Sequence, residues 1–265
     1  MALLQVSFFS NKLKRNVNFN ALIPIDGTEI TEQGRRKAKP FKSLYLLHGY
    51  AGHHNDWLWG SRIKELSSKY NIAVFMPSGE NNFYLDDVDK GELYGEFIGK
   101  ELVDFTRNMF PISDRREDTF IGGLSMGGYG AIRNGLKYNS TFSRIIALSS
   151  ALIIYNIAGI PEDFKDPVAD YKYYRSVFGD LDQLVGSDKD PEALIAKLKE
   201  KNEKIPEIYM ACGTEDFLLK ENRRYQDFLV KQNINATYIE SPGDHDWKFW
   251  DEYIEKAIVW AISKG

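Results

Sequence analysis

The sequence contains little that would stabilise a secreted or disulfide-bonded protein. One cysteine, Cys212, is present among 265 residues, so the chain cannot form an internal disulfide bond. Such sparing use of cysteine is typical of reducing compartments, and we expect a cytoplasmic protein. Cys212 ends the apolar run 208–212, which has the composition of a buried strand. This indicates a packing role rather than a reactive thiol.

Long apolar runs and an export leader are also missing. No stretch approaches the roughly 18 consecutive apolar residues that a membrane span needs, so we expect no membrane partner. Residues 1–10 lack a basic leader, a continuous apolar core and a small-residue cleavage site, and no signal peptide is expected. The 34 basic and 38 acidic residues give a formal net charge of −4, which argues against a nucleic-acid partner.

Histidine is scarce, with four residues in the chain. Three of them, His48, His53 and His54, lie close together, and a metal site is one interpretation of that cluster. Their spacing matches no usual zinc motif, however, and no cluster of cysteines or carboxylates joins them. We therefore expect no metal and no cofactor. His48 is expected to brace its loop through local hydrogen bonds, and the other two to be polar loop residues.

What the chain does contain is a regular alternation of apolar runs and amphipathic segments. This pattern predicts an α/β protein with a mostly parallel central sheet and helices on both faces. Strands are expected at 3–9, 16–25, 43–47, 72–76, 120–121, 143–148, 207–212 and 236–240. Helices are expected at 56–70, 92–110, 129–138, 191–201, 220–232 and 247–264.

The length suits one large domain or two small ones, and we expect a single domain over residues 1–265. Residues 150–205 break the alternation and are rich in tyrosine, aspartate and proline. We interpret this segment as a cap-like insertion over the edge of the sheet at which the parallel strands end. An ordinary long crossover between strands is the alternative.

A glycine-rich turn separates a predicted strand from a predicted helix in the middle of the chain. It has the sequence GLSMG at 123–127, with Ser125 at its apex. In a nucleophile elbow the serine is held in a strained conformation that projects its hydroxyl from the sheet. Small residues are needed two positions to either side because strand and helix nearly touch, and Gly123 and Gly127 meet that need. An ordinary turn is the alternative. A phosphate-binding loop is not expected, because no Lys-Ser or Lys-Thr pair follows the glycines.

A serine hydroxyl attacks a carbonyl only when a base lies within hydrogen-bond reach. His245 is the favoured base, because it lies in the loop between the 236–240 strand and the last predicted helix. A loop at that place can carry an imidazole over the sheet edge toward Ser125. A surface histidine that caps the helix is the alternative.

The base in turn needs an acceptor that orients it. Asp216 is the favoured acid, since it follows the strand 207–212 and its short side chain holds an imidazole rigidly. Glu215 is the immediate alternative, and Asp244 and Asp246 would have to fold back on the base. The order serine, aspartate, histidine is the chain order of the α/β-hydrolase triad.

The developing oxyanion needs backbone N–H donors. One is expected from Met126, the residue after the nucleophile, and the other from the loop that follows the strand 43–47. We favour Tyr50 as the second donor, with Gly49 as the alternative.

Four motifs now resemble a known family. They read HGYAG at 48–52 with NDW at 55–57, GLSMGG at 123–128, GTED at 213–216, and GDHDW at 243–247. Together they resemble the esterase D family of α/β-hydrolases, and within it the bacterial tributyrin esterases and the feruloyl and acetyl esterases. The resemblance runs from about residue 5 to the C-terminus. It implies the α/β-hydrolase fold, with the nucleophile at Ser125, the acid at Asp216, the base at His245 and the oxyanion loop at Tyr50.

The resemblance implies a serine carboxylesterase that needs no metal or cofactor. We expect it to hydrolyse short-chain acyl esters, such as tributyrin-like, acetylated or feruloylated sugar esters, through an acyl-enzyme on Ser125. An S-formylglutathione hydrolase-like thioesterase, or another acyl-transfer enzyme with the same triad, is the alternative. A non-catalytic binding protein is disfavoured, because every position that the chemistry needs is present.

A small-molecule ester is therefore the expected partner, and a homo-oligomer is left open. Aromatic residues crowd the four motifs. These residues are expected to line an acyl or sugar pocket or to pack in the core, and core packing is favoured for Trp250. They are Trp57, Trp59, Phe217, Trp247 and Trp250.

Overall fold

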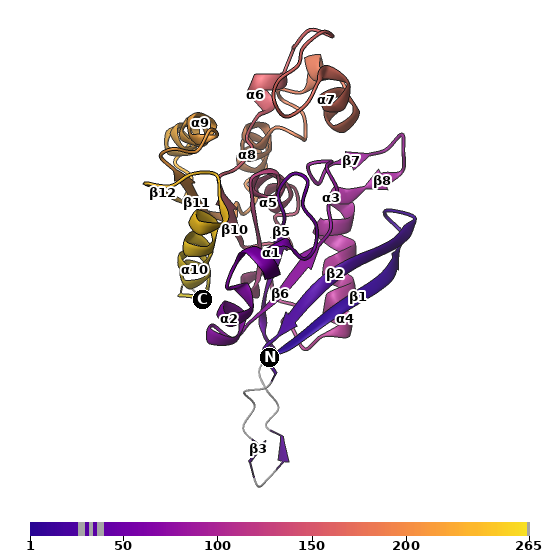
Figure 1. The fold of residues 1–265 in the computed structure, drawn as a ribbon, viewed down its shortest axis with the longest axis vertical. Coiled ribbons are helices and arrows are strands. Elements are labelled where there is room, and N and C mark those ends of the chain that lie inside the picture. Colours follow the sequence, from indigo (N-terminus) through magenta and orange to yellow (C-terminus); the bar gives the residue numbers. More distant parts are fainter. Residues whose placement is uncertain (26–29, 32–33, 36–39, 264–265) are drawn as a thin grey trace.

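The computed structural model describes residues 1–25, 30–31, 34–35 and 40–263. Eight strands form one sheet in the order β1-β2-β6-β5-β9-β10-β11-β12. The pairs β1–β2 and β2–β6 are antiparallel and the other five pairs are parallel, so the predicted mostly parallel sheet is confirmed. Figure 1 shows this sheet between two layers of helices, the layered architecture expected for an α/β-hydrolase.

The strands of the sheet lie within about two residues of the expected segments, except that β9 extends the short run at 120–121 in both directions. Their bounds are β1 Ala2–Ser10, β2 Arg15–Ile23, β5 Lys42–Leu47, β6 Ile72–Pro77, β9 Thr119–Leu124, β10 Arg144–Leu148, β11 Glu207–Gly213 and β12 Ala236–Ser241. Two short antiparallel pairs lie outside the sheet: β3 Ile30–Thr31 with β4 Gly34–Arg35, and β7 Asp86–Asp87 with β8 Glu92–Leu93.

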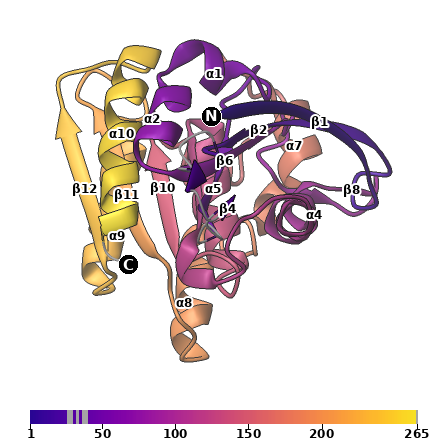
Figure 2. The same ribbon diagram turned by 90° about the horizontal axis from the view of Figure 1, so that it is seen from below.

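The central strands are buried on both faces, as their near-continuous apolar sequences require. In β5, Leu44 and Leu46 join the apolar cluster on one face, and Tyr45 and Leu47 join the cluster on the other. The first face is covered by α1 Asp56–Gly60, α2 Ile63–Lys69 and α10 Trp247–Ser263 (Figure 2). The second is covered by α4 Leu102–Met109, α5 Met126–Lys137, α8 Pro191–Glu200 and α9 Leu219–Lys231.

Two of the expected helices are interrupted. The segment 56–70 forms α1 and α2, because Arg62 donates from its backbone and its guanidinium to Asp251 of α10 at 2.7 Å each, which holds the chain out of helical continuity. The segment 92–110 begins with β8 and continues as α3 Tyr94–Glu96, a π-helical turn at Phe97–Glu101 (η1), and α4. A short 3₁₀ turn, η2 Arg116–Asp118, precedes β9.

Residues 150–205 contain four helical elements rather than the one that the sequence makes evident. They are α6 Ile154–Ile157, α7 Tyr171–Phe178, the 3₁₀ turn η3 Leu181–Gln183, and α8. The expectation missed α7, whose start is set by the Asp170 carboxylate accepting from the N–H of Tyr173 at 2.9 Å. Figure 1 shows α6 and α7 above the sheet, at the end toward which the parallel strands run.

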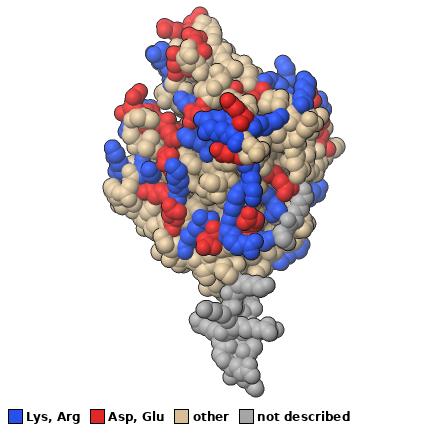
Figure 3. All heavy atoms as spheres, turned by 180° about the vertical axis from the view of Figure 1, so that it is seen from behind, with Lys and Arg blue, Asp and Glu red and all other residues tan. Residues whose placement is uncertain are grey.

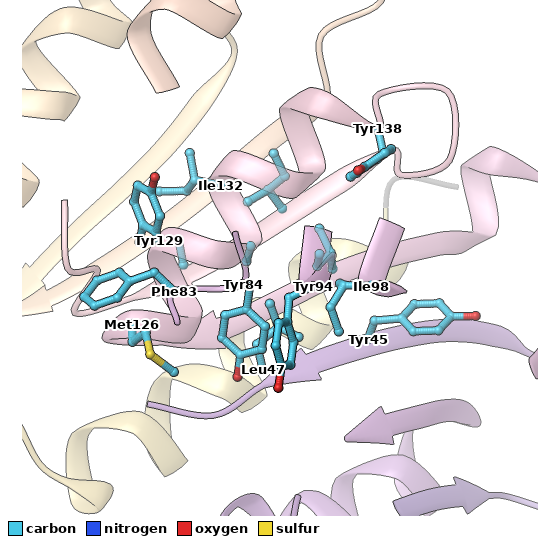
Figure 4. Close-up of a cluster of buried hydrophobic side chains, with 14 of the residues drawn as sticks. Tyr45, Leu47, Phe83, Tyr84, Tyr94, Ile98, Met126, Tyr129, Ile132 and Tyr138 are labelled. Carbon is cyan, nitrogen blue, oxygen red and sulfur yellow. The ribbon is translucent and has the colours of Figure 1, made fainter. Parts of the chain in front are cut away.

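Polar contacts with buried side chains of α5 fasten this segment to the helix. Tyr129 donates to the carbonyl of Lys189 at 2.6 Å, and Arg133, which is 1% exposed, donates to the carboxylate of Asp188 at 2.6 Å. Figure 4 shows Tyr129 in the aromatic cluster that packs α5 against Phe83 and Tyr84. The position of the segment above the sheet is therefore set by contacts that reach deep into the core.

The outer surface is of mixed charge. Basic and acidic side chains are interspersed over the face shown in Figure 3. Across residues 1–25, 30–31, 34–35 and 40–263, no helix has the length and apolar character needed to cross a membrane.

Candidate active site

The turn between β9 and α5 places Ser125 in a backbone conformation that L-residues rarely adopt, with φ of 52° and ψ of −119°. Such a conformation costs about 1–3 kcal/mol and persists only where its surroundings enforce it. The N–H of Ser125 donates to the carbonyl of Leu148 at 2.9 Å, and the N–H of Ala151 donates to the carbonyl of Ser125 at 3.0 Å. The end of β10 and the residues just after it thus hold the strained serine in place.

The expected need for small residues beside Ser125 is confirmed. A Cβ atom at Gly123 would lie 2.4 Å from the carbonyl oxygen of Gly127, and one at Gly127 would lie 2.5 Å from the carbonyl oxygens of Leu47 and His48. No side chain fits at either position unless the backbone moves. Strand β9, helix α5 and the end of β5 therefore meet at backbone contact, directly beneath the serine hydroxyl.

The structure brings the three distant side chains together. His245 Nε2 lies 3.0 Å from Ser125 Oγ, and His245 Nδ1 lies 2.9 Å from Asp216 Oδ2. Ser125 follows β9, Asp216 follows β11 and His245 follows β12, so all three stand at the same edge of the sheet. A hydroxyl, an imidazole and a carboxylate in this arrangement can act as a nucleophile, a base and an acceptor that orients the base.

The other acid candidates have different partners. Glu215 accepts a hydrogen bond from the N–H of Gly243 at 2.6 Å, and Asp244 accepts from the N–H of His245 at 2.7 Å. Asp246 accepts from the N–H of Phe249 at 2.9 Å, so this aspartate caps the start of α10 and the histidine does not. Among the four acids that the sequence offers near the base, Asp216 contacts the imidazole.

Asp216 is buried, and a buried carboxylate needs donors. Burial alone would raise its pKa, but hydrogen bonds from His245, from Ser149 and from the N–H of Leu218 hold the pKa of Asp216 below its usual range. The carboxylate is therefore ionised at neutral pH and aligned on the imidazole.

Ser149 is the member of this network that sequence reasoning missed. It follows β10, is fully buried, and has a φ of 47°. Its Oγ accepts from Trp250 Nε1 at 3.0 Å, which leaves its own proton for Asp216. A signal did exist, because Ser149 directly follows a predicted strand, at the same edge as Ser125 and Asp216. Its neighbour Ser150 looks the same in sequence and makes no side-chain hydrogen bond with any described residue.

The backbone N–H groups of Met126 and Tyr50, which are expected to donate to an oxyanion, donate to no acceptor within the described chain. Met126 is the first residue of α5, where helical N–H groups have no intrahelical partner, and Tyr50 lies in the loop after β5. Both residues line the cavity that contains Ser125, as does Gly49.

Buried side chains hold this loop. His48 is 1% exposed, lies 2.7 Å through Nδ1 from the carbonyl of Gly49, and accepts through Nε2 from the N–H of Gly79 at 2.8 Å. Burial lowers the pKa of His48, so the imidazole is neutral and its bracing role is confirmed. Tyr84 adds a hydrogen bond to the carbonyl of His48 at 3.0 Å. This contact was missed, because Tyr84 lies in a segment that reads as a polar loop.

The remaining histidines contact polar side chains. His53 Nδ1 lies 3.4 Å from Asp56 Oδ1, and His54 Nδ1 lies 2.8 Å from Ser78 Oγ. Over the part of the chain that the structure describes, no group of three or more His, Cys, Asp or Glu side chains could hold a metal ion. Cys212 is buried, and burial raises the pKa of its thiol, which agrees with the expected packing role.

A cavity of about 760 Å³ opens beside Ser125. Of the five aromatic residues singled out from sequence, Phe217, Trp247 and Trp250 line it. Trp57 is 1% exposed and packs in the core, whereas Trp59 is 74% exposed and does not line the cavity. Trp250 is also buried, and its ring meets the imidazole of His245 edge-on with centroids 5.0 Å apart. It therefore contributes to both the core and the site.

Comparison with known proteins gives a consistent result. The Esterase family model matches residues 10–260. An acetyl esterase from Caldicellulosiruptor saccharolyticus is 57% identical over 260 residues, which cover 98% of each chain. A substrate-bound fluorophosphonate-binding serine hydrolase from Staphylococcus aureus has a TM-score of 0.86 at 28% identity, with 98% of each chain covered.

Two further solved structures are similar in fold. An S-formylglutathione hydrolase from Staphylococcus aureus has a TM-score of 0.84 at 28% identity, with 98% of each chain covered. A ferulic acid esterase has a TM-score of 0.72 at 20% identity, with 98% of this chain and 97% of the other covered. The likeness in each case extends over nearly the whole molecule.

Proposed function

We propose, from the premise that the chain belongs to the Esterase family and is a serine-dependent hydrolase of carboxylic esters, that Ser125, His245 and Asp216 carry out the reaction. The observation that supports these roles most directly is the contact of His245 with Ser125 Oγ at 3.0 Å and with Asp216 at 2.9 Å. Hydroxyl, base and acceptor are within hydrogen-bond distance without any rearrangement.

The reaction is acyl transfer in two halves. Ser125 Oγ attacks the ester carbonyl carbon while His245 Nε2 takes the hydroxyl proton, and a tetrahedral oxyanion forms. The oxyanion collapses, the C–O bond to the alcohol breaks, and His245 returns the proton to the leaving oxygen. Water then attacks the acyl-enzyme with His245 again as base, and release of the acid restores the free serine.

Asp216 stays ionised throughout this cycle and stabilises the imidazolium that forms twice. The N–H groups of Met126 and Tyr50 receive the oxyanion, with Gly49 as the alternative to Tyr50. Their support is that no described residue accepts from Met126 or Tyr50 in the free protein. Losing one such donor would cost on the order of 3 kcal/mol in the transition state.

The substrate is a small ester with a short acyl group, and acetyl esters are the first choice. Support comes from the acetyl esterase that shares 57% of its residues with this chain. Cleavage of a thioester such as S-formylglutathione is the second candidate, because a hydrolase so described shares the fold at 28% identity. Acetyl, butyryl and feruloyl sugar esters assayed beside thioesters separate the two.

Residues 150–205 act in this proposal as a cap-like insertion within a single domain. Its support is that Ile153, Asn156, Asp166, Val168 and Tyr174 line the cavity beside Ser125. A cytoplasmic location, the lack of nucleic-acid or membrane partners, and a possible homo-oligomer stay predictions.

Replacing the nucleophile tests the proposed roles. Ser125→Ala should lower kcat for p-nitrophenyl acetate by at least about 10⁴-fold, because removing the nucleophile of a triad leaves only residual catalysis. Ser150→Ala is the matched control, since it removes a buried hydroxyl 25 residues further on that has no partner among the described residues. Substantial turnover by folded Ser125→Ala would reject this nucleophile.

A further inference from the structure

Three carboxylates line the cavity that contains Ser125, and within the described chain no lysine or arginine lines it. Asp56 is the first residue of α1, Asp166 precedes α7, and Glu221 lies in the first turn of α9. They come from separate parts of the fold and converge on one space. The triad mechanism uses none of them.

The partners of these carboxylates do not cancel their charge. Asp166 accepts from the hydroxyl of Tyr174 at 2.8 Å and from two backbone N–H groups, those of Val168 and Ala169, also at 2.8 Å. All of these donors are neutral. These hydrogen bonds hold the carboxylate in position, and its negative charge stays without a cationic partner beside the cavity.

Glu221 is arranged in the same way. Its Oε1 accepts from the Asn156 amide at 2.8 Å, and its Oε2 is shielded from solvent and has no hydrogen-bond partner in the part of the chain that is described. Asp56 Oδ1 lies 3.4 Å from the imidazole of His53, which is a cation only when protonated. No lysine or arginine within the described ranges forms an ion pair with Asp56, Asp166 or Glu221.

The walls between the carboxylates strengthen their effect. Tyr174, Phe217 and Trp247 line the same cavity and displace water with aromatic surface. Charges act over longer distances in a cleft with such walls than in bulk solvent, and a cleft lined with one sign of charge concentrates that field. The three carboxylates therefore place negative charge around a ligand in the cavity, and within the described chain no lysine or arginine lies there to offset it.

We propose that Asp56, Asp166 and Glu221 make this esterase selective for the charge of its substrate, so that it cleaves neutral and cationic esters and rejects esters that carry a carboxylate or a phosphate. The inference rests on the proposed function and deepens it. It divides the two candidate substrate classes, because acetyl esters of neutral sugars carry no charge, whereas thioesters of glutathione carry a net negative charge.

Two pairs of acetate esters test the selectivity. The first pair is 3-acetoxybenzoate and 3-acetoxybenzamide, which have nearly the same shape and differ by one negative charge. The second is acetylcholine and 3,3-dimethylbutyl acetate, which differ by one positive charge. Each kcat/KM is divided by the rate constant for hydroxide-catalysed hydrolysis of the same ester. The native enzyme should prefer the amide to the benzoate at least tenfold and should cleave acetylcholine at least as well as its neutral counterpart.

Neutralising substitutions identify the residues responsible. Glu221→Gln, Asp166→Asn and Asp56→Asn should each lower the preference for the amide by about three- to tenfold, as expected for charges several ångströms apart in a partly buried cleft. Asp227→Asn is the control on the same helix as Glu221, because this exposed carboxylate lies outside the cavity. Salt at about 0.5 M should also reduce the native preference.

The ratio of two esters measured on one preparation does not depend on how much of a variant is folded. Equal normalised rates for benzoate and amide in the native enzyme would overturn the proposal, as would a ratio unchanged by all three substitutions. Failure of the underlying function would look different, since neither ester would then be cleaved through Ser125.

Discussion

The two walls of the cavity beside Ser125 are built in contrasting ways. On the sheet side, Ser125, Ser149 and Asp216 are at most 8% exposed, and two of them hold positive φ angles. On the side formed by residues 150–205, the lining includes Val168, which is 51% exposed, and Asp166 in a loop. The strained, buried residues are held at the sheet edge, whereas the opposite wall includes an exposed valine and a loop aspartate.

This difference assigns separate tasks to the two walls. In the proposed mechanism the sheet edge holds the reacting groups within hydrogen-bond distance of one another, and the wall from 150–205 contacts the rest of the substrate. Substitutions at the sheet edge should therefore lower kcat, and substitutions on the other wall should mainly change KM and selectivity.

The largest loss of kcat among these tests of the two walls is expected from replacing Asp216. Asp216→Asn should lower kcat by about 10³- to 10⁴-fold, because the amide cannot stabilise the imidazolium and favours the wrong tautomer. Glu215→Gln is the adjacent control and should change kcat less than about threefold. Steady-state kinetics with p-nitrophenyl acetate measure both, and comparable losses in the two variants would contradict the choice of acid.

The pH dependence should follow the base and not the acid. The pKa of Asp216 is held below its usual range, so this carboxyl is already ionised at pH 5, and its contribution to stability is lost only as pH falls through that lowered value. His245 can act as a base only in its neutral form, so kcat/KM should fall at acidic pH, where the imidazole is protonated. A flat profile down to pH 5 would exclude an imidazole base.

Ser149 should act through Asp216, as a positioning residue. Ser149→Ala should lower kcat about tenfold with little change in KM, because the carboxylate loses a charge-assisted hydrogen bond and Trp250 loses its acceptor.

A second substitution separates loss of the hydroxyl from strain. Ser149→Gly also removes the hydroxyl, but glycine readily adopts the φ of 47°. Its kcat should therefore equal that of Ser149→Ala, and it should be more stable to denaturant than Ser149→Ala. Activity of Ser149→Gly close to that of the native enzyme would show that the hydroxyl has no role.

The smallest effect is expected on the wall from 150–205. The hydroxyl of Tyr173 donates to the carbonyl of Asn81, and its ring meets that of Tyr50 with centroids 5.7 Å apart. Tyr173→Phe keeps the ring contact and should raise KM by less than about threefold with kcat unchanged. Tyr171→Phe, on the same helix, is the control. A large loss of kcat in Tyr173→Phe would break the proposed division between the walls.

The sequence alone predicts much of the sheet edge, because its requirements are local. Gly123 and Gly127 mark the turn at Ser125 within five residues, and with four histidines in the chain the search for a base is short. Asp216 is favoured over its neighbours by its place after a strand. In each case the deciding feature lies within a few residues of the one it identifies.

Other features of the fold and the site depend on contacts between distant segments and could not be predicted from the local sequence. Ser149 and Ser150 look equivalent in sequence. Of the two, Ser149 forms side-chain hydrogen bonds with Asp216 and Trp250, which lie more than 60 residues further along the chain. The break at Arg62 depends on Asp251, and the neutral surroundings of Glu221 depend on Asn156. Such pairings follow from the assembled fold.

The most direct test of the central claim is covalent labelling of the native enzyme with a fluorophosphonate, followed by mass spectrometry of its peptides. The account predicts one modified residue, Ser125, with labelling abolished by Ser125→Ala and greatly slowed by substitution of His245. Labelling that instead falls on another serine, or that persists at full rate without His245, would contradict it.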